Sequence, residues 1–217
     1  QTPLIAHIAV RLMHEAGVPG AALNFVPGLG PDVAQHVLPD PRVAGVAFTG
    51  STEVAQIINR ELAARPGPIA ALIAETGGQN AMLVDSSALP EQVVHDAVTS
   101  AFNSAGQRCS ALRVLFLQED VADRTIELLK GYMDQLVIGD PAYLRTDVGP
   151  VIDEEALGIL EAHADKIAGI GRVIHRCRLG AETEHGHFFA PMAVEIDSLS
   201  QLEREVFGPI MHIVRYK

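Results

Sequence analysis

Two side chains, Cys109 and Glu75, are of types that can carry out covalent chemistry as a pair. Cys109 lies in the run Asn103–Ser110 (NSAGQRCS), and Glu75 is followed directly by two glycines. A thiol on a glycine-bearing turn can act as a nucleophile, and a carboxylate presented by a glycine turn can act as its base. Arg108 and the exposed amides of such a turn favour the thiolate, the reactive form. Taken singly, the cysteine is also compatible with a buried apolar filler, and the glutamate with a solvated or helix-capping carboxylate.

The run Phe48–Thr52 (FTGST) is a candidate phosphate-binding turn. Thr49, Gly50 and Ser51 lie where a predicted strand passes into a predicted helix. Backbone N–H groups and the positive end of the helix dipole can meet a phosphate there. The dinucleotide fingerprint G-x-G-x-x-G is absent, because Val33 stands where its third glycine should be. By itself the turn is also compatible with an ordinary strand-to-helix connection.

The segment Glu205–Pro209 (EVFGP) places a carboxylate and an aromatic ring two residues apart. Read alone, it is compatible with a loop anchored by Phe207. It is the last of four candidate motifs, which follow one another in the order FTGST, ETGGQN, NSAGQRCS and EVFGP.

Three other reactive side chains are interpreted as bystanders. Cys177 lies between two arginines on an ordinary segment, without the glycines that surround Cys109. His185 and His187 could form a metal pair on a strand edge. Because no cysteine or carboxylate stands clearly at ligand spacing nearby, we expect no metal.

Composition restricts the classes of partner. The net charge is −11, with 48% hydrophobic and 20% charged residues. Nucleic acid and anionic lipid need clustered Lys and Arg, so neither is expected to contact this segment. There is no apolar stretch of about 18 residues for a membrane span and no signal peptide at the start. The two cysteines favour a reducing, cytoplasmic location over a structural disulfide.

Apolar periodicity predicts strands and helices in alternation, which indicates an α/β fold with parallel strands and crossover helices. Helices are expected over residues 3–16, in a short stretch ending near 38, and over 52–64, 90–106, 120–134 and 154–168, the last ended by Gly169. Strands are expected over residues 22–26, 45–48, 68–74, 80–84, 113–117 and 210–214. Residues 1–76 are interpreted as part of a doubly wound nucleotide-binding domain, and residues 77–217 as a second α/β unit.

The four motifs together resemble the aldehyde dehydrogenase superfamily, over residues 1–217. The resemblance implies a three-layer α/β/α fold, with a partial NAD-binding domain in residues 1–76 and a catalytic domain, truncated at its C-terminus, in residues 77–217. The chain starts without Met and ends just after a predicted strand. We therefore expect a fragment of a longer chain that is inactive by itself and whose parent is a homo-oligomer.

The resemblance also implies a role for each motif. Cys109 would be the nucleophile, and Glu75 the base that activates the hydrolytic water. The turn at Thr49, Gly50 and Ser51 would bind the cofactor pyrophosphate. Gly77 would lie near the nicotinamide, Glu205 would hold the nicotinamide ribose, and Phe207 would pack the nicotinamide ring.

These roles imply aldehyde oxidation through a cysteine thiohemiacetal and thioester. Glu75 favours the hydrolytic reaction, because acylating relatives use the thiol without this base. Within the superfamily the sequences around Glu75, Cys109 and Phe207 look like the glutamate γ-semialdehyde (pyrroline-5-carboxylate) dehydrogenase branch of bifunctional bacterial proline-utilisation enzymes. There a serine such as Ser110 helps hold the substrate carboxylate. The cofactor would be NAD, with FAD confined to a separate proline dehydrogenase domain.

Two alternatives remain open. One is oxidation of another semialdehyde or of betaine aldehyde. The other is a non-catalytic module of the same family that serves assembly, although such modules typically lose the nucleophile that this chain retains.

Overall fold

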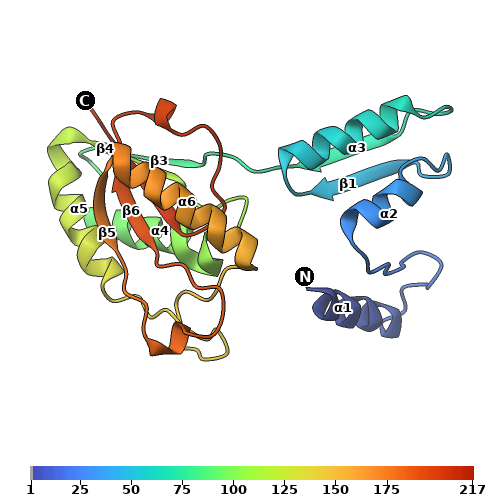
Figure 1. The fold of residues 1–217 in the computed structure, drawn as a ribbon, viewed down its shortest axis with the longest axis horizontal. Helices are drawn as coiled ribbons and strands as arrows, with labels where there is room; N and C mark the ends of the chain where they lie inside the picture. Colours follow the sequence, from blue (N-terminus) through green and yellow to red (C-terminus); the bar gives the residue numbers. More distant parts are fainter. Residues whose placement is uncertain (1) are drawn as a thin grey trace. The chain divides into compact units, whose positions relative to one another are not determined.

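The computed structural model describes residues 2–217, which form two compact units with the boundary between Thr76 and Gly77. Each unit has its own β-sheet, of two strands in the first and five in the second (Figure 1). Strands and helices alternate over residues 45–75 and 81–133, as the apolar periodicity predicted, but the last three strands follow one another without an intervening α-helix. Within the described residues no helix is long and apolar enough to cross a membrane.

The first unit is a small parallel α/β arrangement. Its elements are α1 (Pro3–Glu15), α2 (Gly30–Val37), β1 (Gly45–Thr49), α3 (Thr52–Ala64) and β2 (Ala71–Glu75). The two strands pair in parallel, joined by α3. Leu38, Ile58 and Leu62 are the buried side chains of its small apolar cluster.

Residues 22–26, predicted as a strand, are irregular, so that prediction was wrong. The alternation behind it is real, because Leu23 and Phe25 are half-buried and the Phe25 ring lies against His7 of α1. Among the described residues, however, no strand lies beside this segment. A strand is defined by hydrogen bonds to a neighbour, which alternation alone cannot supply.

The second unit contains most of the regular structure. Its elements are β3 (Ala81–Val84), α4 (Pro90–Phe102), η1 (Asn103–Gly106), β4 (Val114–Gln118), α5 (Glu119–Met133), α6 (Glu154–Ile170), β5 (Arg172–Arg176), η2 (Ala181–Thr183), β6 (Met192–Glu195), η3 (Leu199–Gln201) and β7 (Ile210–Tyr216). The strand order is β3-β4-β7-β6-β5, and only the β5–β6 pair is antiparallel.

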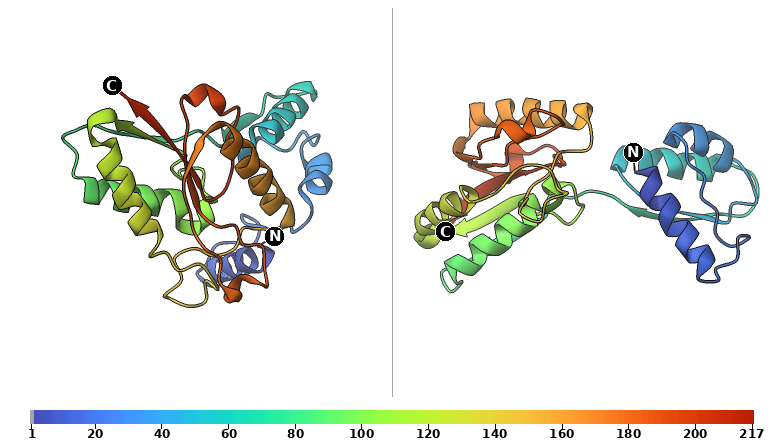
Figure 2. Two further views of the ribbon diagram at one scale, coloured as in Figure 1. Left: turned by 60° about the vertical axis from the view of Figure 1, so that its left-hand side comes forward. Right: turned by 90° about the horizontal axis from the view of Figure 1, so that it is seen from below.

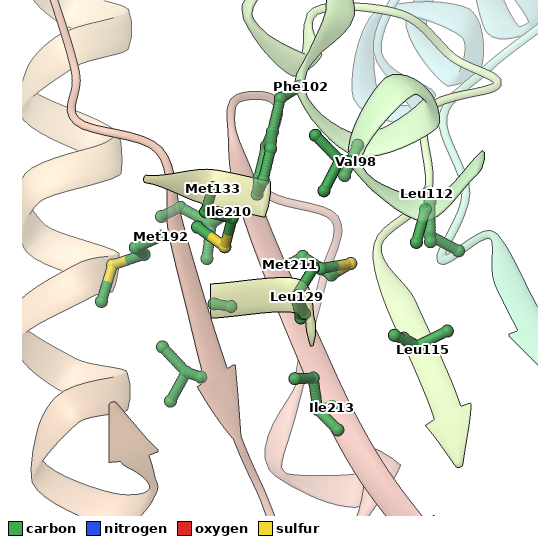
Figure 3. Close-up of a cluster of buried hydrophobic side chains, with 14 of the residues drawn as sticks. Val98, Phe102, Leu112, Leu115, Leu129, Met133, Met192, Ile210, Met211 and Ile213 are labelled. Atoms are coloured by element: carbon green, nitrogen blue, oxygen red, sulfur yellow. The ribbon is translucent and has the colours of Figure 1, made fainter. Parts of the chain in front are cut away.

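The sheet of this unit is covered on both faces, so the unit is a three-layer α/β/α sandwich. In Figure 2, at right, α6 lies on one side of the sheet and α4 and α5 lie on the other. Met211 and Ile213 of β7 and Leu115 of β4 are buried together with Val98 of α4 and Leu129 of α5 (Figure 3). Burial on both faces explains why β4 and β7 read as continuous apolar runs.

Two strands of this sheet, β5 and β6, were not predicted from the sequence. The β5 sequence RVIHR carries charges at both ends and lies at the sheet edge, and β6 has only four residues. Neither has the length or the apolar run of a buried strand.

Gly169, predicted to end the helix before β5, lies inside α6, and the helix ends one residue later, at Ile170. A Cβ at Gly169 would meet nothing within 4 Å. At Gly171 a Cβ would lie 2.7 Å from the carbonyl oxygen of Glu195 in β6. The stop is therefore set by close packing against β6, not by the first glycine in the sequence.

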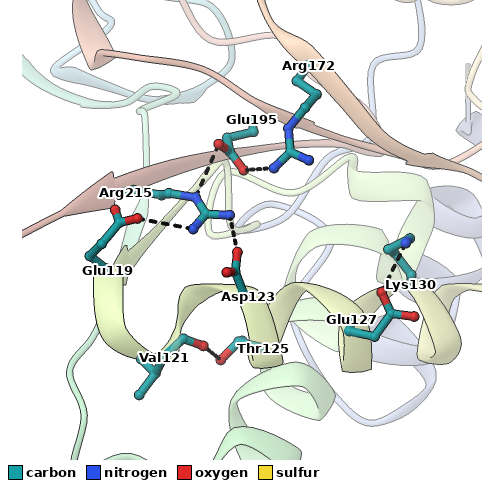
Figure 4. Close-up of polar contacts among 9 residues, drawn as sticks. All are labelled: Glu119, Val121, Asp123, Thr125, Glu127, Lys130, Arg172, Glu195 and Arg215. Atoms are coloured by element: carbon teal, nitrogen blue, oxygen red, sulfur yellow. Dashed lines mark hydrogen bonds and ion pairs between the residues drawn. The ribbon is translucent and has the colours of Figure 1, made fainter.

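An ion-pair network joins α5 to the sheet (Figure 4). The Arg215 guanidinium of β7 contacts Glu195 of β6 at 3.2 Å, and Glu119 and Asp123 of α5 at 3.4 and 2.7 Å. Arg172 of β5 contacts the second oxygen of Glu195 at 2.7 Å. Three strands and α5 are thus tied together at one end of the sheet.

Candidate functional site

The nucleophile turn, residues 103–110, begins where α4 ends at Phe102. The prediction that the helix runs on to Gly106 was wrong, because Ser104, Ala105 and Gly106 all have positive φ, at 56°, 52° and 64°. A Cβ on Gly106 would overlap the carbonyl group of Gly208. Left-handed backbone is costly for Ser and Ala and persists only where the surroundings hold it.

Cys109 is exposed at the end of this turn, and Ser110 beside it is also exposed. The side-chain amide of Asn80 donates to the carbonyl oxygens of Cys109 and Ala111, at 2.6 and 2.9 Å. Asn80, the residue before β3, thereby anchors the backbone on both sides of Ser110. The sequence analysis did not assign a role to Asn80, although it stands inside the ETGGQN motif.

Cys177 has the opposite environment. It is buried, and its thiol donates to the carbonyl oxygen of Met133 at 3.4 Å. Burial raises the pKa of the Cys177 thiol to about 11, and the charge of Asp134 adds to this effect. Because the thiolate is the reactive form, the structure gives Cys177 low reactivity.

The carboxylate segment, residues 205–209, lies against the first residues of this unit. The Glu205 Oε2 atom accepts a hydrogen bond from the Gly78 N–H at 3.1 Å. A Cβ on Gly77 would overlap that same oxygen, so the approach requires glycine. The predicted cofactor residues Gly77 and Glu205 are thus in direct contact.

Arg113, just before β4, is the residue of this region that the sequence analysis missed. It is only 1% exposed, and its Nη2 and Nε atoms donate to Glu205 Oε1 at 2.9 and 3.1 Å. Its guanidinium carbon lies 5.4 Å from the centroid of the Phe207 ring, which is 46% exposed. Burial lowers the pKa of Arg113, while the hydrogen bond and charge of Glu205 oppose that shift. The signal in the sequence that could have identified Arg113 is its position directly before an apolar strand.

The Glu205 carboxylate keeps the capacity to bind a further donor. It has about four lone-pair sites, and the contacts above use three of them. Its side chain is 14% exposed. A fixed carboxylate with a free acceptor position fits a ligand that presents hydroxyl groups.

In the first unit, Thr49 and Glu75 are direct neighbours. They are paired in the parallel register of β1 and β2, and the Gly50 N–H donates to the Glu75 carbonyl oxygen at 3.1 Å. The Ser51 hydroxyl caps α3 by accepting the Val54 N–H at 3.2 Å. The predicted phosphate turn and the predicted base therefore share one sheet edge, at the carboxyl ends of parallel strands, where α/β proteins bind ligands.

The position of Ser51 is compatible both with a helix cap and with a phosphate-binding turn. Its hydroxyl serves as the cap, while the N–H groups at the start of the 13-residue helix α3 point toward the same end. Gly50 is required here because a Cβ would overlap the Phe48 ring. Glu75 is exposed, and it belongs to the first unit whereas Cys109 belongs to the second.

His185 and His187 lie in an irregular segment after η2, not on a strand edge as supposed. Across residues 2–217, no three His, Cys, Asp or Glu side chains are grouped as a metal site requires. The carbonyl of His187 instead accepts the Val151 N–H at 2.8 Å.

Curated relatives match the whole chain. It is 50% identical over 224 residues to the bifunctional protein PutA of Klebsiella aerogenes, which covers 100% of this chain and 17% of the relative. It is 35% identical to the 1-pyrroline-5-carboxylate dehydrogenase of Geobacillus kaustophilus, covering 97% of this chain and 41% of the relative. The chain thus spans under a fifth of the PutA protein and about two fifths of the single-function dehydrogenase.

Solved structures agree with these relatives. A mutant of Bradyrhizobium japonicum proline utilization A (PutA) is 55% identical with a TM-score of 0.94, over 100% of this chain and 22% of that one. A Staphylococcus aureus betaine aldehyde dehydrogenase in complex with NAD+ is 26% identical with a TM-score of 0.92, over 100% and 44%. The aldehyde dehydrogenase family profile matches residues 1–217. The chain therefore belongs to the aldehyde dehydrogenase family.

Proposed function

We propose that this chain is the nucleophile-bearing part of an NAD-dependent dehydrogenase that oxidises glutamate γ-semialdehyde to glutamate. The observation that carries the proposal is the exposed Cys109 on a strained turn, beside a buried arginine that holds Glu205. The activity belongs to the longer protein, since the relatives extend well beyond the matched region.

The choice of substrate rests on the relatives. PutA proteins and 1-pyrroline-5-carboxylate dehydrogenases match over nearly all of this chain. Pyrroline-5-carboxylate is the cyclised form of glutamate γ-semialdehyde. Ser110, exposed next to Cys109, would donate a hydrogen bond from its hydroxyl to the carboxylate end of this substrate.

In the first chemical step Cys109 would be the nucleophile. Its thiolate attacks the aldehyde carbon and forms a thiohemiacetal. Backbone N–H groups near the turn stabilise the resulting oxyanion. Bound NAD would accept the hydride that leaves this carbon, and Cys109 is left as a thioester.

The second step would use Glu75 as a general base. Its carboxylate takes a proton from water, and the hydroxide attacks the thioester carbon. The carbon–sulfur bond breaks, which releases the acid and restores the Cys109 thiolate. An exposed carboxylate at the end of β2 is accessible to water, as this role needs.

Each predicted cofactor motif would contact a different part of the cofactor. The amides around Thr49, Gly50 and Ser51 would receive the pyrophosphate, since they lie at the N-terminus of α3. Glu205 would use its free acceptor position for a ribose hydroxyl, and the exposed Phe207 ring would pack against the nicotinamide. The Gly77 backbone, which lies against Glu205, would lie near the nicotinamide.

The test compares Glu75→Gln with Cys109→Ala in the full-length protein, supplied with glutamate γ-semialdehyde and NAD. Glu75→Gln should give a burst of about one equivalent of NADH and then turnover slowed on the order of 10²–10⁴-fold, because hydrolysis alone loses its base. Cys109→Ala should abolish the burst and the turnover together.

Cys177→Ala is the matched control and should retain both phases, because Cys177 is buried and its thiol donates to the Met133 carbonyl oxygen. Loss of the burst in Glu75→Gln would show that Glu75 acts before hydride transfer and would refute its role in hydrolysis. Faster turnover with betaine aldehyde or another semialdehyde would refute the substrate. Full activity in Cys109→Ala would refute the mechanism.

A further inference from the structure

We infer that Arg113 is a positioning residue that couples the nucleophile turn to the carboxylate segment, so that a change at Glu205 alters the reactivity of Cys109. The functional meaning of this coupling rests on the proposed function, since it would link the cofactor-binding carboxylate to the attacking thiol. The coupling itself depends only on the contacts of Arg113.

Arg113 makes hydrogen bonds to both segments at once. Toward the nucleophile turn, its Nη2 atom donates to the carbonyl oxygen of Arg108 at 3.2 Å. Toward the carboxylate segment, Nη1 donates to the Gly208 carbonyl oxygen at 3.0 Å, and Nε and Nη2 donate to Glu205. One planar group therefore fixes the residue before Cys109 and both ends of the Glu205–Gly208 stretch.

The two segments also touch directly. The Gly208 carbonyl that Arg113 holds is the same group that a Cβ on Gly106 would overlap. Displacing Gly208 would therefore displace the backbone at Gly106 as well. The strained residues Ser104 and Ala105 come immediately before it, and strain of this kind needs a rigid surrounding.

Burial makes this arrangement sensitive to Glu205. Arg113 is 1% exposed, and Glu205 is the one carboxylate with which it forms an ion pair in the described part of the chain. A buried guanidinium that loses its carboxylate must find other acceptors or more water. Its other acceptors are the carbonyls of Arg108 and Gly208, so its response reaches the turn that carries Cys109.

A purely stabilising ion pair predicts something different. In that case Glu205 and Arg113 would support the fold, but neutralising Glu205 would leave Cys109 unchanged except for the direct effect of the lost charge. Such a direct effect acts through space and does not require the Arg113 hydrogen bonds. The two interpretations are therefore separable by a double-mutant cycle.

The experiment measures the rate of iodoacetamide alkylation of Cys109, by peptide mapping, in the full-length protein. The variants are Glu205→Gln, Arg113→Lys and the double variant. Glutamine keeps the shape of glutamate without its charge, and lysine keeps the charge of arginine without its planar set of donors. In the otherwise unsubstituted protein, Glu205→Gln should change the alkylation rate of Cys109 on the order of 3-fold or more. In the Arg113→Lys background the same substitution should change that rate by under about 1.5-fold.

Equal effects of Glu205→Gln in the two backgrounds would overturn the inference in favour of a direct charge effect. An unchanged Cys109 rate in Glu205→Gln alone would also overturn it. Alkylation of the buried Cys177 reports unfolding in every variant. Neither rate depends on aldehyde oxidation, so an inactive protein that shows the coupling would refute the proposed function and leave this inference intact.

If Arg113→Lys does not fold, hydrogen exchange in the Glu205→Gln variant tests whether Glu205 is coupled to the nucleophile turn. The amides of residues 107–112 should exchange faster than in the unsubstituted protein, while those of β6 stay unchanged. Unchanged exchange in residues 107–112 would overturn the inference.

Discussion

The two units use the same strand–helix–strand pattern but differ sharply in burial. In the first, β1 and β2 are exposed or half-buried at every position, and the apolar cluster has three buried members, Leu38, Ile58 and Leu62. In the second, β4 and β7 are buried at most positions beneath helices on both faces. Apolar content alone does not create a core, because a parallel sheet must also be wide enough and covered on both faces.

The difference in packing also separates two groups of candidate functional residues. Thr49, Gly50 and Glu75 stand on the thinly packed sheet of the first unit, and their geometry comes from strand pairing and one helix cap. Cys109 and Glu205 stand on the densely packed unit, where Arg113 and Asn80 hold them through several hydrogen bonds. The second group should therefore be the more rigid.

The largest expected effect is on hydrogen exchange in this 217-residue chain. Amides of β4 and β7 should exchange on the order of 10³-fold more slowly than those of β1 and β2, because the thinner sheet opens locally at lower free-energy cost. Mass spectrometry of peptic peptides measures this directly. Similar protection in the two sheets would contradict the comparison.

A smaller effect is expected from matched truncations in the two sheets. Leu115→Ala in β4 should lower the free energy of unfolding by about 2–5 kcal/mol, because Leu115 is fully buried. Ile73→Ala in β2 should change it by less than about 0.5 kcal/mol, since that side chain is 61% exposed. Urea unfolding of the chain gives both values, and a cost at Ile73 equal to that at Leu115 would count against the difference in packing.

The same contrast between core and exposed turn applies to the two thiols. The raised pKa of Cys177, about 11 against an ordinary value of 9.0, leaves roughly 100-fold less thiolate at neutral pH. Limited iodoacetamide treatment followed by peptide mapping should therefore label the exposed Cys109 well before the buried Cys177. Preferential labelling of Cys177 would remove Cys109 as the candidate nucleophile.

The smallest effect is a loss of stability in acid that arises in the second unit. His212 is 3% exposed, its ring contacts His163 at 2.9 Å, and burial followed by the charge of His163 lowers the pKa of His212 to about 4. Folding favours its neutral form, so its contribution is complete above about pH 6.5 and is lost as the pH falls toward about 4.

Between pH 7.5 and pH 5, the titration of His212 should lower the free energy of unfolding by about 2 kcal/mol. The substitution His212→Gln should remove most of this pH dependence. Urea unfolding at the two pH values measures the difference. His36→Gln is the control from the first unit, where the histidines are exposed, and it should behave like the unsubstituted chain. Identical pH dependence in all three proteins would show that His212 does not contribute.

Much of the fold was predictable where one period dominates the sequence. The helices over residues 3–15, 52–64 and 119–133 were predicted to within two residues, because each carries an apolar face at helical spacing. The predictions failed for residues 22–26 and for β5 and β6. In those places hydrogen-bond partners and the position in the sheet decide the structure, and the local sequence determines neither of them.

By itself the sequence determined the α/β class, the order of the four motifs and the chemical types that could react. These depend on local periodicity and on residue identity. Tertiary structure alone decided that Arg113 would join the turn of Cys109 to Glu205, that Gly77 would have to be glycine, and that burial would raise the pKa of Cys177. The Arg113 contacts join residues up to 95 positions apart in the chain, and burial changes a pKa only after the whole sheet has assembled.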